Sequence, residues 1–142
     1  MRVLIDTNVI VDVLQNRAPW FADGQQIFLA AANQIITGCI TAKQAADIYY
    51  FSRKQFRGED FVDDKARKII VGLYSIFELL DKKAVDCKNA LGLSNNDYED
   101  AILISTAARE NVDCIVTRNI EHFRSCTNIP VYAPDAFVNH EL

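Results

Sequence analysis

The stretch that decides the fold lies at the start of the chain and reads Val3-Leu4-Ile5-Asp6-Thr7-Asn8-Val9-Ile10. Its first three residues are β-branched or apolar and predict a short buried strand that ends at Asp6. The residues from Asn8 to Leu14 predict a helix, because their apolar side chains recur at helical spacing. The chain therefore opens on a strand that passes directly into a helix.

The same alternation continues along the sequence. Further strands are predicted at residues 35–40, 84–87, 114–117 and 129–132. Helices are predicted at residues 8–14, 19–32, 41–53 and 59–80, after Ser94 or Asn96, near Glu121, and from Pro134. Thr41 and Gln44 have the spacing of a capping box at the start of one helix. Strands that alternate with helices predict a three-layer α/β domain, in which a parallel sheet is covered on both faces.

Composition limits the remaining possibilities. The chain has 142 residues, of which 50% are hydrophobic and 24% charged, so we expect one globular domain over residues 1–142 and exclude a disordered protein. Neither a signal peptide nor a membrane-spanning run is recognisable, and we expect a soluble, cytoplasmic protein. The four cysteines are widely spaced, without a C-x-x-C pair, and predict buried free thiols and no zinc site; they are Cys39, Cys87, Cys114 and Cys126.

The charge balance restricts how the protein can meet nucleic acid. Fifteen Lys and Arg against nineteen Asp and Glu give a net charge of −4, and the acidic excess lies in the second half. A general electrostatic grip on nucleic acid needs the opposite sign, so any such contact is local or is assisted by bound cations. The densest basic stretch is the candidate contact for nucleic acid and is equally compatible with a solvated pair of helices; it comprises Arg53, Lys54, Arg57, Lys65, Arg67 and Lys68.

Several polar residues fall where an α/β sheet holds its ligands, beyond the carboxyl ends of its strands. They stand at a strand end or at the start of the helix that follows, and are Asp6, Asp97, Asp100 and Asn119. Singly, each could be a helix cap or a turn residue. Together, the carboxylates would repel one another unless a cation lay among them, and oxygen ligands suit Mg²⁺ or Mn²⁺. This pattern indicates phosphoryl chemistry.

Two other acidic features have plainer interpretations. Asp47 lies in the second turn of the helix that follows Thr41, where a solvated position and a functional one are equally compatible with the sequence. The acidic run at residues 59–64 begins a predicted helix and is followed by basic residues, so we interpret it as a solvated face.

With these motifs in this order, the chain resembles a PIN domain, the nuclease domain that includes the toxins of many bacterial toxin–antitoxin pairs. Residues 3–10 resemble the family's first motif, residues 41–50 its second around Asp47, residues 96–101 its third around Asp100, and residues 115–119 its fourth. Residues 130–137 are also typical of the subgroup.

The resemblance implies a five-stranded parallel sheet in a Rossmann-like arrangement and metal-dependent cleavage of RNA phosphodiester bonds. It also implies a small antitoxin partner and a homodimer. Asp6 and Asp100 would bind Mg²⁺ or Mn²⁺, Asp47 would complete the set, and Asp97 would bind directly or through water. The supporting residues would be Thr7, Asn8, Thr117 and Asn119. The sequence departs from the family where Asn119 replaces a fourth acid, with Glu121 nearby.

Three other functions are compatible with parts of this pattern. A PIN-fold module that binds RNA or a partner without cutting fits the acidic charge and Asn119. A phosphoacceptor domain would need a lysine at the end of a late strand, where the chain has Arg118. A haloacid-type phosphatase would need Asp-x-Asp after the first strand, where the chain has Asp6-Thr7-Asn8.

Overall fold

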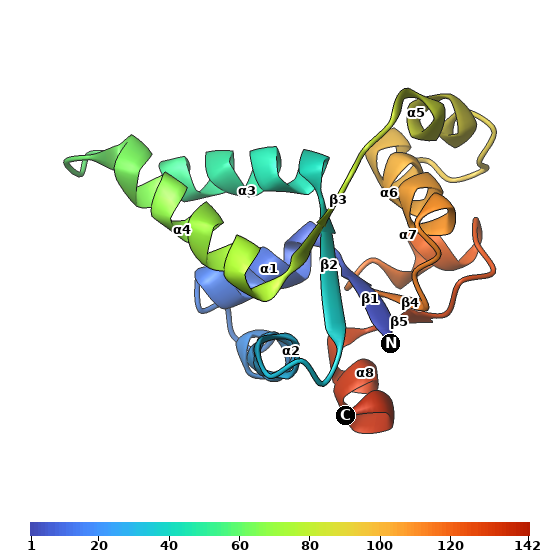
Figure 1. The fold of residues 1–142 in the computed structure, drawn as a ribbon, viewed down its shortest axis with the longest axis horizontal. Coiled ribbons are helices and arrows are strands. Elements are labelled where there is room, and N and C mark those ends of the chain that lie inside the picture. Colours follow the sequence, from blue (N-terminus) through green and yellow to red (C-terminus); the bar gives the residue numbers. More distant parts are fainter.

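The computed structural model describes residues 1–142 and contains one five-stranded sheet in which every strand pair is parallel. The strands are β1 (Arg2–Ile5), β2 (Thr37–Thr41), β3 (Glu78–Leu80), β4 (Cys114–Val116) and β5 (Val131–Tyr132), in the spatial order β3-β2-β1-β4-β5. Figure 1 shows β1 at the centre of the sheet. The predicted α/β fold with a five-stranded parallel sheet is confirmed.

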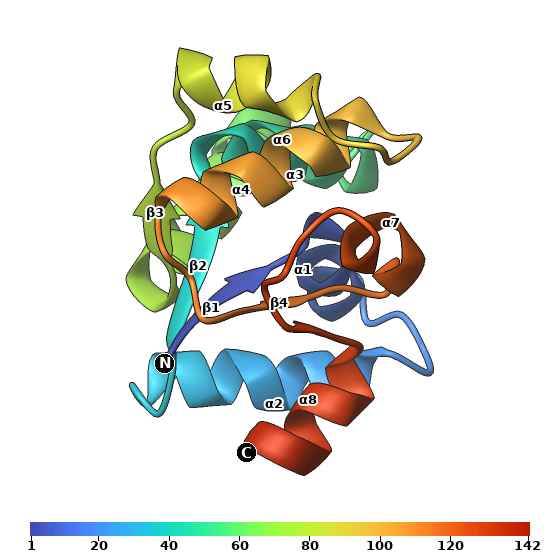
Figure 2. The ribbon, with the colours of Figure 1, turned by 90° about the vertical axis from the view of Figure 1, so that its right-hand side faces the viewer.

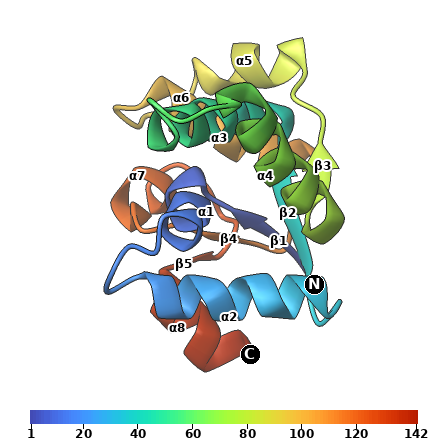
Figure 3. The ribbon, with the colours of Figure 1, turned by 90° about the vertical axis from the view of Figure 1, so that its left-hand side faces the viewer.

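Eight helices connect and cover the strands. They are α1 (Thr7–Leu14), α2 (Phe21–Ala32), α3 (Ala42–Gln55), α4 (Val62–Ile76), α5 (Ala84–Ala90), α6 (Tyr98–Arg109), α7 (Ile120–Arg124) and α8 (Pro134–Glu141). Figure 2 shows α2 and α8 below the sheet and α5 and α6 above it, and Figure 3 shows the same layers from the opposite side. None of the helices combines the length and apolarity that a membrane span requires.

The alternation of strand side chains divides the core between the two faces of the sheet. Val3 and Ile5 of β1 pack into one cluster with residues of α1, α2, α4 and α8, among them Ile27 and Phe137. Leu4, which points the other way, packs into a second cluster with residues of α6 and α7, among them Phe123. Both faces of the sheet are therefore covered by helices and buried, as is usual for a parallel sheet.

The strand order places one functional position at the centre of the sheet. From β1 the chain continues to β2 on one side, whereas β4 joins the other side of β1. The carboxyl ends of β1 and β4 meet there, and the backbone N–H of Asp6 donates to the carbonyl of Val116 at 2.9 Å. In open α/β sheets the ligand crevice lies at this switch in strand order.

The third strand was wrongly predicted. Residues 84–87 form the start of α5 instead of a strand, because Asp86 caps that helix by accepting from the Lys83 N–H at 2.8 Å. The strand is β3, which the sequence pattern had joined to the preceding helix. That helix is α4, which begins at Val62 and ends at Ile76, and the pairing of Leu79 with Ile40 of β2 draws the next residues into the sheet. Tertiary pairing thus overrides a continuous helical pattern.

Smaller corrections concern a helix cap and the thiols. The N-cap of α6 is Asp97, and neither Ser94 nor Asn96 takes that place. The predicted capping box of Thr41 and Gln44 is present at the start of α3. All four cysteines are free, as predicted, but only Cys39 and Cys114 are buried, while the other two are partly exposed.

Candidate active site

Asp6 is a buried carboxylate at the junction of β1 and α1, with 6% of its surface exposed. It is the N-cap of α1 and accepts from the Thr7 N–H at 2.7 Å. Its other oxygen accepts from the Asn8 amide at 3.0 Å and from the Thr117 hydroxyl at 2.7 Å. All of these donors are uncharged, and Asp6 forms no ion pair. The cap and the functional interpretation of Asp6 are therefore compatible.

Burial raises the pKa of Asp6 to about 6. The negative charge of Asp100 raises this pKa further, while the hydrogen bond from Thr117 opposes the increase. Because the group is desolvated and faces another carboxylate, its charged form is costly unless a cation approaches.

Thr117 and Asn8 fix the orientation of Asp6. The buried Thr117 hydroxyl donates to Asp6 and accepts from the Asn119 N–H at 3.0 Å. The Asn8 amide donates to Asp6, and its oxygen accepts from the Arg118 N–H at 3.3 Å. The turn after β4 is thereby tied to the start of α1, and the carboxylate has little freedom to rotate.

Asp100 and Asp97 stand at the start of α6. Asp97 caps the helix by accepting from the Asp100 N–H at 3.1 Å. Oδ2 of Asp100 is within hydrogen-bonding distance of Nδ1 of His122, at 3.0 Å. Burial raises the pKa of Asp100, the hydrogen bond from His122 opposes this, and the charge of Asp97 raises it further. Two carboxylates at this edge, Asp6 and Asp100, are thus both harder to ionise than usual.

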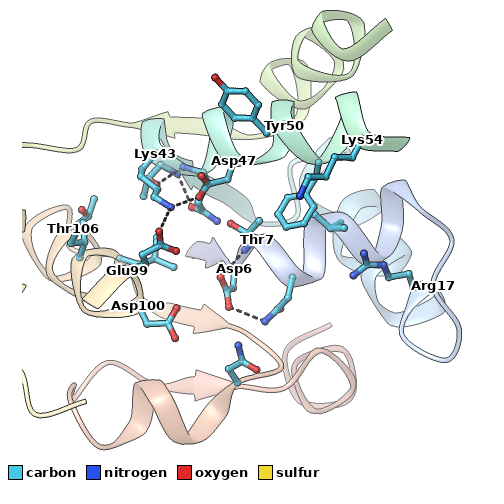
Figure 4. Close-up of a pocket in the computed structure, with 18 residues that line it drawn as sticks. Asp6, Thr7, Arg17, Lys43, Asp47, Tyr50, Lys54, Glu99, Asp100 and Thr106 are labelled. Carbon is cyan, nitrogen blue, oxygen red and sulfur yellow. Dashed lines mark hydrogen bonds and ion pairs between the residues drawn. The ribbon is translucent and has the colours of Figure 1, made fainter. Parts of the chain in front are cut away.

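Asp47 forms an ion pair on its own helix. Lys43, one helical turn earlier on α3, forms an ion pair with Asp47 and a second with Glu99 of α6 at 3.2 Å. Figure 4 shows the Lys43 ammonium between these two carboxylates. The charge of Asp47 is therefore balanced by a lysine of the protein itself, whereas that of Asp6 is not.

These side chains surround a cavity of about 460 Å³, within the usual range for ligand sites. Four acidic and three basic side chains line it, namely Asp6, Asp47, Glu99, Asp100, Arg17, Lys43 and Lys54. Figure 4 shows Arg17 and Lys54 on the side away from Asp100. Thr7, Asn8 and Asn119 also line the cavity. The structure thus brings together most of the predicted site residues.

Other predicted residues lie outside the cavity. Asp97 is not among the lining residues, although its carboxylate is close to Asp100. Of the predicted RNA contacts, Lys54 lines the cavity, whereas Arg53 and Arg57 do not. Arg53 bonds to the hydroxyl of Tyr49 instead, at 3.1 Å. Glu121 is exposed on α7 and does not line the cavity.

The residues present fit Mg²⁺ or Mn²⁺. Carboxylate oxygens are the ligands these ions prefer, and Asp6 and Asp100 lack a cationic lysine or arginine partner. Asp97, Asp100 and His122 form a group of donors whose ligand atoms all lie within 4.8 Å of one another. Of this group only Asp100 lines the cavity, which it shares with Asp6 and Asp47.

A model of the PIN domain family matches residues 2–121 of the sequence. The chain belongs to the PIN domain family. Members of this family are typically nucleases. A comparison with curated proteins gave no significant match.

Solved structures with the same fold agree with this assignment. A chain of the VapBC2 complex from Rickettsia felis, solved with a promoter DNA fragment, has a TM-score of 0.65 and 20% identity, covering 94% of this PIN domain chain and 98% of that chain. A toxin–antitoxin complex from Klebsiella pneumoniae gives 0.67 and 19%, with coverages of 93% and 97%. FitAB bound to the IR36 DNA fragment gives 0.73 and 14%, with coverages of 93% and 94%.

The sequence did not single out Lys43, Glu99 or His122 of this PIN domain. Their types and spacing are those of ordinary exposed helical residues, and only the approach of α3 and α7 to α6 gives them a role. Arg118 was also missed as a support. It pairs with the buried Asp12 at 2.7 Å and lies over the Trp20 ring at 4.0 Å, which anchors the turn after β4.

Proposed function

We propose that this PIN domain is a Mg²⁺- or Mn²⁺-dependent endoribonuclease that hydrolyses RNA phosphodiester bonds. The observation that carries the proposal is the pair Asp6 and Asp100. Both are largely buried carboxylates with raised pKa values, the charge of Asp100 contributes to the raised pKa of Asp6, and both line one cavity. A divalent cation bound between two such carboxylates stabilises the ionised form of both.

In this proposal Asp6 and Asp100 hold the metal, with Asp97 close to Asp100 and Asp47 outside the direct ligand set. A bound divalent ion would activate a water molecule and offset charge on the phosphate. Thr117, Asn8 and Thr7 keep both Asp6 oxygens in place through the hydrogen bonds described above. Asn119 offers a neutral amide at the cavity wall, where it adds no further negative charge.

Lys43 decides whether Asp47 can take part. While its ammonium pairs with Asp47 and Glu99, neither carboxylate is available as a free ligand. With Arg17 and Lys54 it also gives the cavity three positive charges, which reduce the repulsion of an incoming phosphate. We therefore place Asp47 outside the direct ligands of the metal. We expect the Lys43 ammonium to contact the phosphate of the bound RNA.

We further propose that the enzyme is the toxin of a toxin–antitoxin pair and forms a homodimer. The support for the toxin is likeness of fold to chains solved in toxin–antitoxin complexes, whereas the homodimer rests on the family resemblance. A small reading frame next to the gene, whose product suppresses growth arrest by this chain, is the expected finding. Growth unaffected by expression of the active chain would contradict the toxin assignment.

The test of the nuclease is cleavage of single-stranded RNA with Mg²⁺, with Mn²⁺ and with EDTA. We expect cleavage with either ion, none with EDTA, and none by the Asp100→Asn variant. Asp60→Asn is the matched control, because Asp60 is exposed, outside the cavity and without an ion pair. RNA binding without cleavage by the metal-loaded wild type would replace the proposal with the non-cutting RNA-binding module.

A further inference from the structure

The donors closest to one another at this edge include a nitrogen. Nδ1 of His122 lies 3.0 Å from Oδ2 of Asp100, and the ligand atoms of Asp97, Asp100 and His122 are mutually within 4.8 Å. A divalent ion with bonds of about 2.1 Å holds adjacent ligands roughly 3 Å apart and opposite ones roughly 4.2 Å apart. The separation of the His122 and Asp100 atoms is that of adjacent ligands, and the 4.8 Å limit places the Asp97 oxygen close to the range that a single ion spans.

Two helices hold this arrangement in place. Asp97 and Asp100 belong to the first turn of α6, where the capping bond fixes their backbone. His122 belongs to α7, and its backbone N–H donates to the Asn119 carbonyl at 3.1 Å. The Asn95 amide donates to the His122 carbonyl at 3.3 Å, which ties α7 to the segment before α6.

His122 remains reachable from solvent. About half of its side chain is exposed, at 52%, whereas that of Asp100 is 16% exposed. An ion can therefore enter beside the ring without opening the core. Asp100 has no side-chain partner other than His122, so one of its oxygens remains available.

We propose that Nδ1 of His122 is a further ligand of the divalent ion that Asp6 and Asp100 hold, on the side where Asp97 lies, and that it makes the site prefer Mn²⁺ to Mg²⁺. The inference rests on the proposed metal dependence and specifies the metal. Mg²⁺ takes oxygen ligands almost exclusively, whereas imidazole binds first-row transition ions well. A site that adds one imidazole to its carboxylates thus favours Mn²⁺, where an all-oxygen site would not discriminate as strongly.

The direct test is pulsed electron paramagnetic resonance of the full chain loaded with Mn²⁺ alone. We expect nuclear modulation from a directly bound imidazole nitrogen, its loss in His122→Asn, and its persistence in His140→Ala. His140 is the other histidine of the chain and lies exposed on α8, so it is the matched control. Wild-type protein that binds Mn²⁺ without nitrogen modulation, or that binds no Mn²⁺, would overturn the proposal.

A competition experiment supplies the second readout. His122→Ala should lower the affinity for Mn²⁺ roughly tenfold or more and change that for Mg²⁺ much less. His122→Asp should shift the preference toward Mg²⁺ by replacing the nitrogen ligand with an oxygen ligand. An unchanged Mn²⁺-to-Mg²⁺ affinity ratio in both variants would show that His122 only pairs with Asp100. Nitrogen modulation in a protein that cleaves no RNA would reject the nuclease and leave the ligand assignment standing.

Discussion

Asp6 and Asp86 are both buried aspartates, but only Asp86 is paired with a positively charged side chain. Asp86 receives hydrogen bonds from the Arg109 guanidinium on both oxygens, at 2.8 and 2.9 Å, and from Thr106 and the Lys83 N–H. The Arg109 guanidinium lowers the pKa of Asp86. Asp6 has only neutral donors, faces Asp100, and has its pKa raised by burial.

The difference separates a structural charge from a functional one. The Asp86 centre supplies its own cation and has no need of an ion, so it stabilises the packing of α5 on α6. The Asp6 centre keeps a desolvated carboxylate beside a cavity, which costs stability in the absence of a cation. A buried charge that the protein itself leaves without a counter-charge is a candidate for ligand binding.

The largest expected effect distinguishes the two centres by activity. Asp6→Asn should reduce RNA cleavage roughly a hundredfold to a thousandfold, because the amide cannot help hold a divalent ion. Asp86→Asn should leave the rate per folded molecule within a factor of about 3, since Asp86 does not line the cavity and its amide can still accept from Thr106. Both rates are measured with folded protein quantified by circular dichroism. Equal losses in the two variants would remove the distinction.

Stability should respond in the reverse sense. Asp86→Ala should lower the free energy of unfolding by about 3 kcal/mol, because Arg109 loses its buried partner and Thr106 an acceptor. Asp6→Asn in EDTA should hold or raise that free energy, since a repelling, desolvated charge is removed. Urea denaturation of both variants measures the difference. A large loss of stability in metal-free Asp6→Asn would mean that Asp6 is chiefly a structural cap.

The dependence of stability on pH sharpens the comparison. Unfolded Asp6 releases its proton near pH 3.9, but folded Asp6 does so at about 6, so the folded state binds more protons between these values. Stability from Asp6 is present below pH 4 and is lost as pH rises through 6, by roughly 3 kcal/mol in EDTA. Asp86 acts oppositely, because its lowered pKa makes stability fall as pH falls.

Denaturation between pH 4 and 7, in EDTA, checks this prediction. The wild type should lose stability relative to Asp6→Asn as pH rises through that window. Parallel pH profiles for the two proteins would contradict the raised pKa of Asp6.

The smallest expected effect concerns the basic side of the cavity. Lys54→Glu should weaken RNA binding several-fold and lower the salt dependence of binding by about one to two phosphate contacts. Arg57→Glu is the matched control, because Arg57 is exposed and does not line the cavity. Binding isotherms at several salt concentrations decide the matter. If Arg57→Glu has the larger effect, RNA follows the outer surface of the α3–α4 connection and not the cavity.

The two centres also differ in how far the sequence predicts them. Asp6, Thr117 and Asn119 follow strands, and the ends of parallel strands meet, so their convergence could be expected from order alone. The local pattern around Asp86 predicted a strand. It also could not reveal that Arg109, 23 residues later, supplies the counter-charge of Asp86. Lys43 and Glu99 were missed for the same reason, since their ion pair depends on α3 and α6 meeting across the cavity.

The most direct measurement of the central claim is the shift in melting temperature that Mn²⁺ produces in the metal-free protein. Because an ion that binds only the folded state stabilises it, the wild type and Asp86→Asn should both gain stability as Mn²⁺ increases. Asp6→Asn should gain much less at every concentration. Equal gains in the wild type and Asp6→Asn, or no gain in the wild type, would contradict the assignment of Asp6 to a cation site.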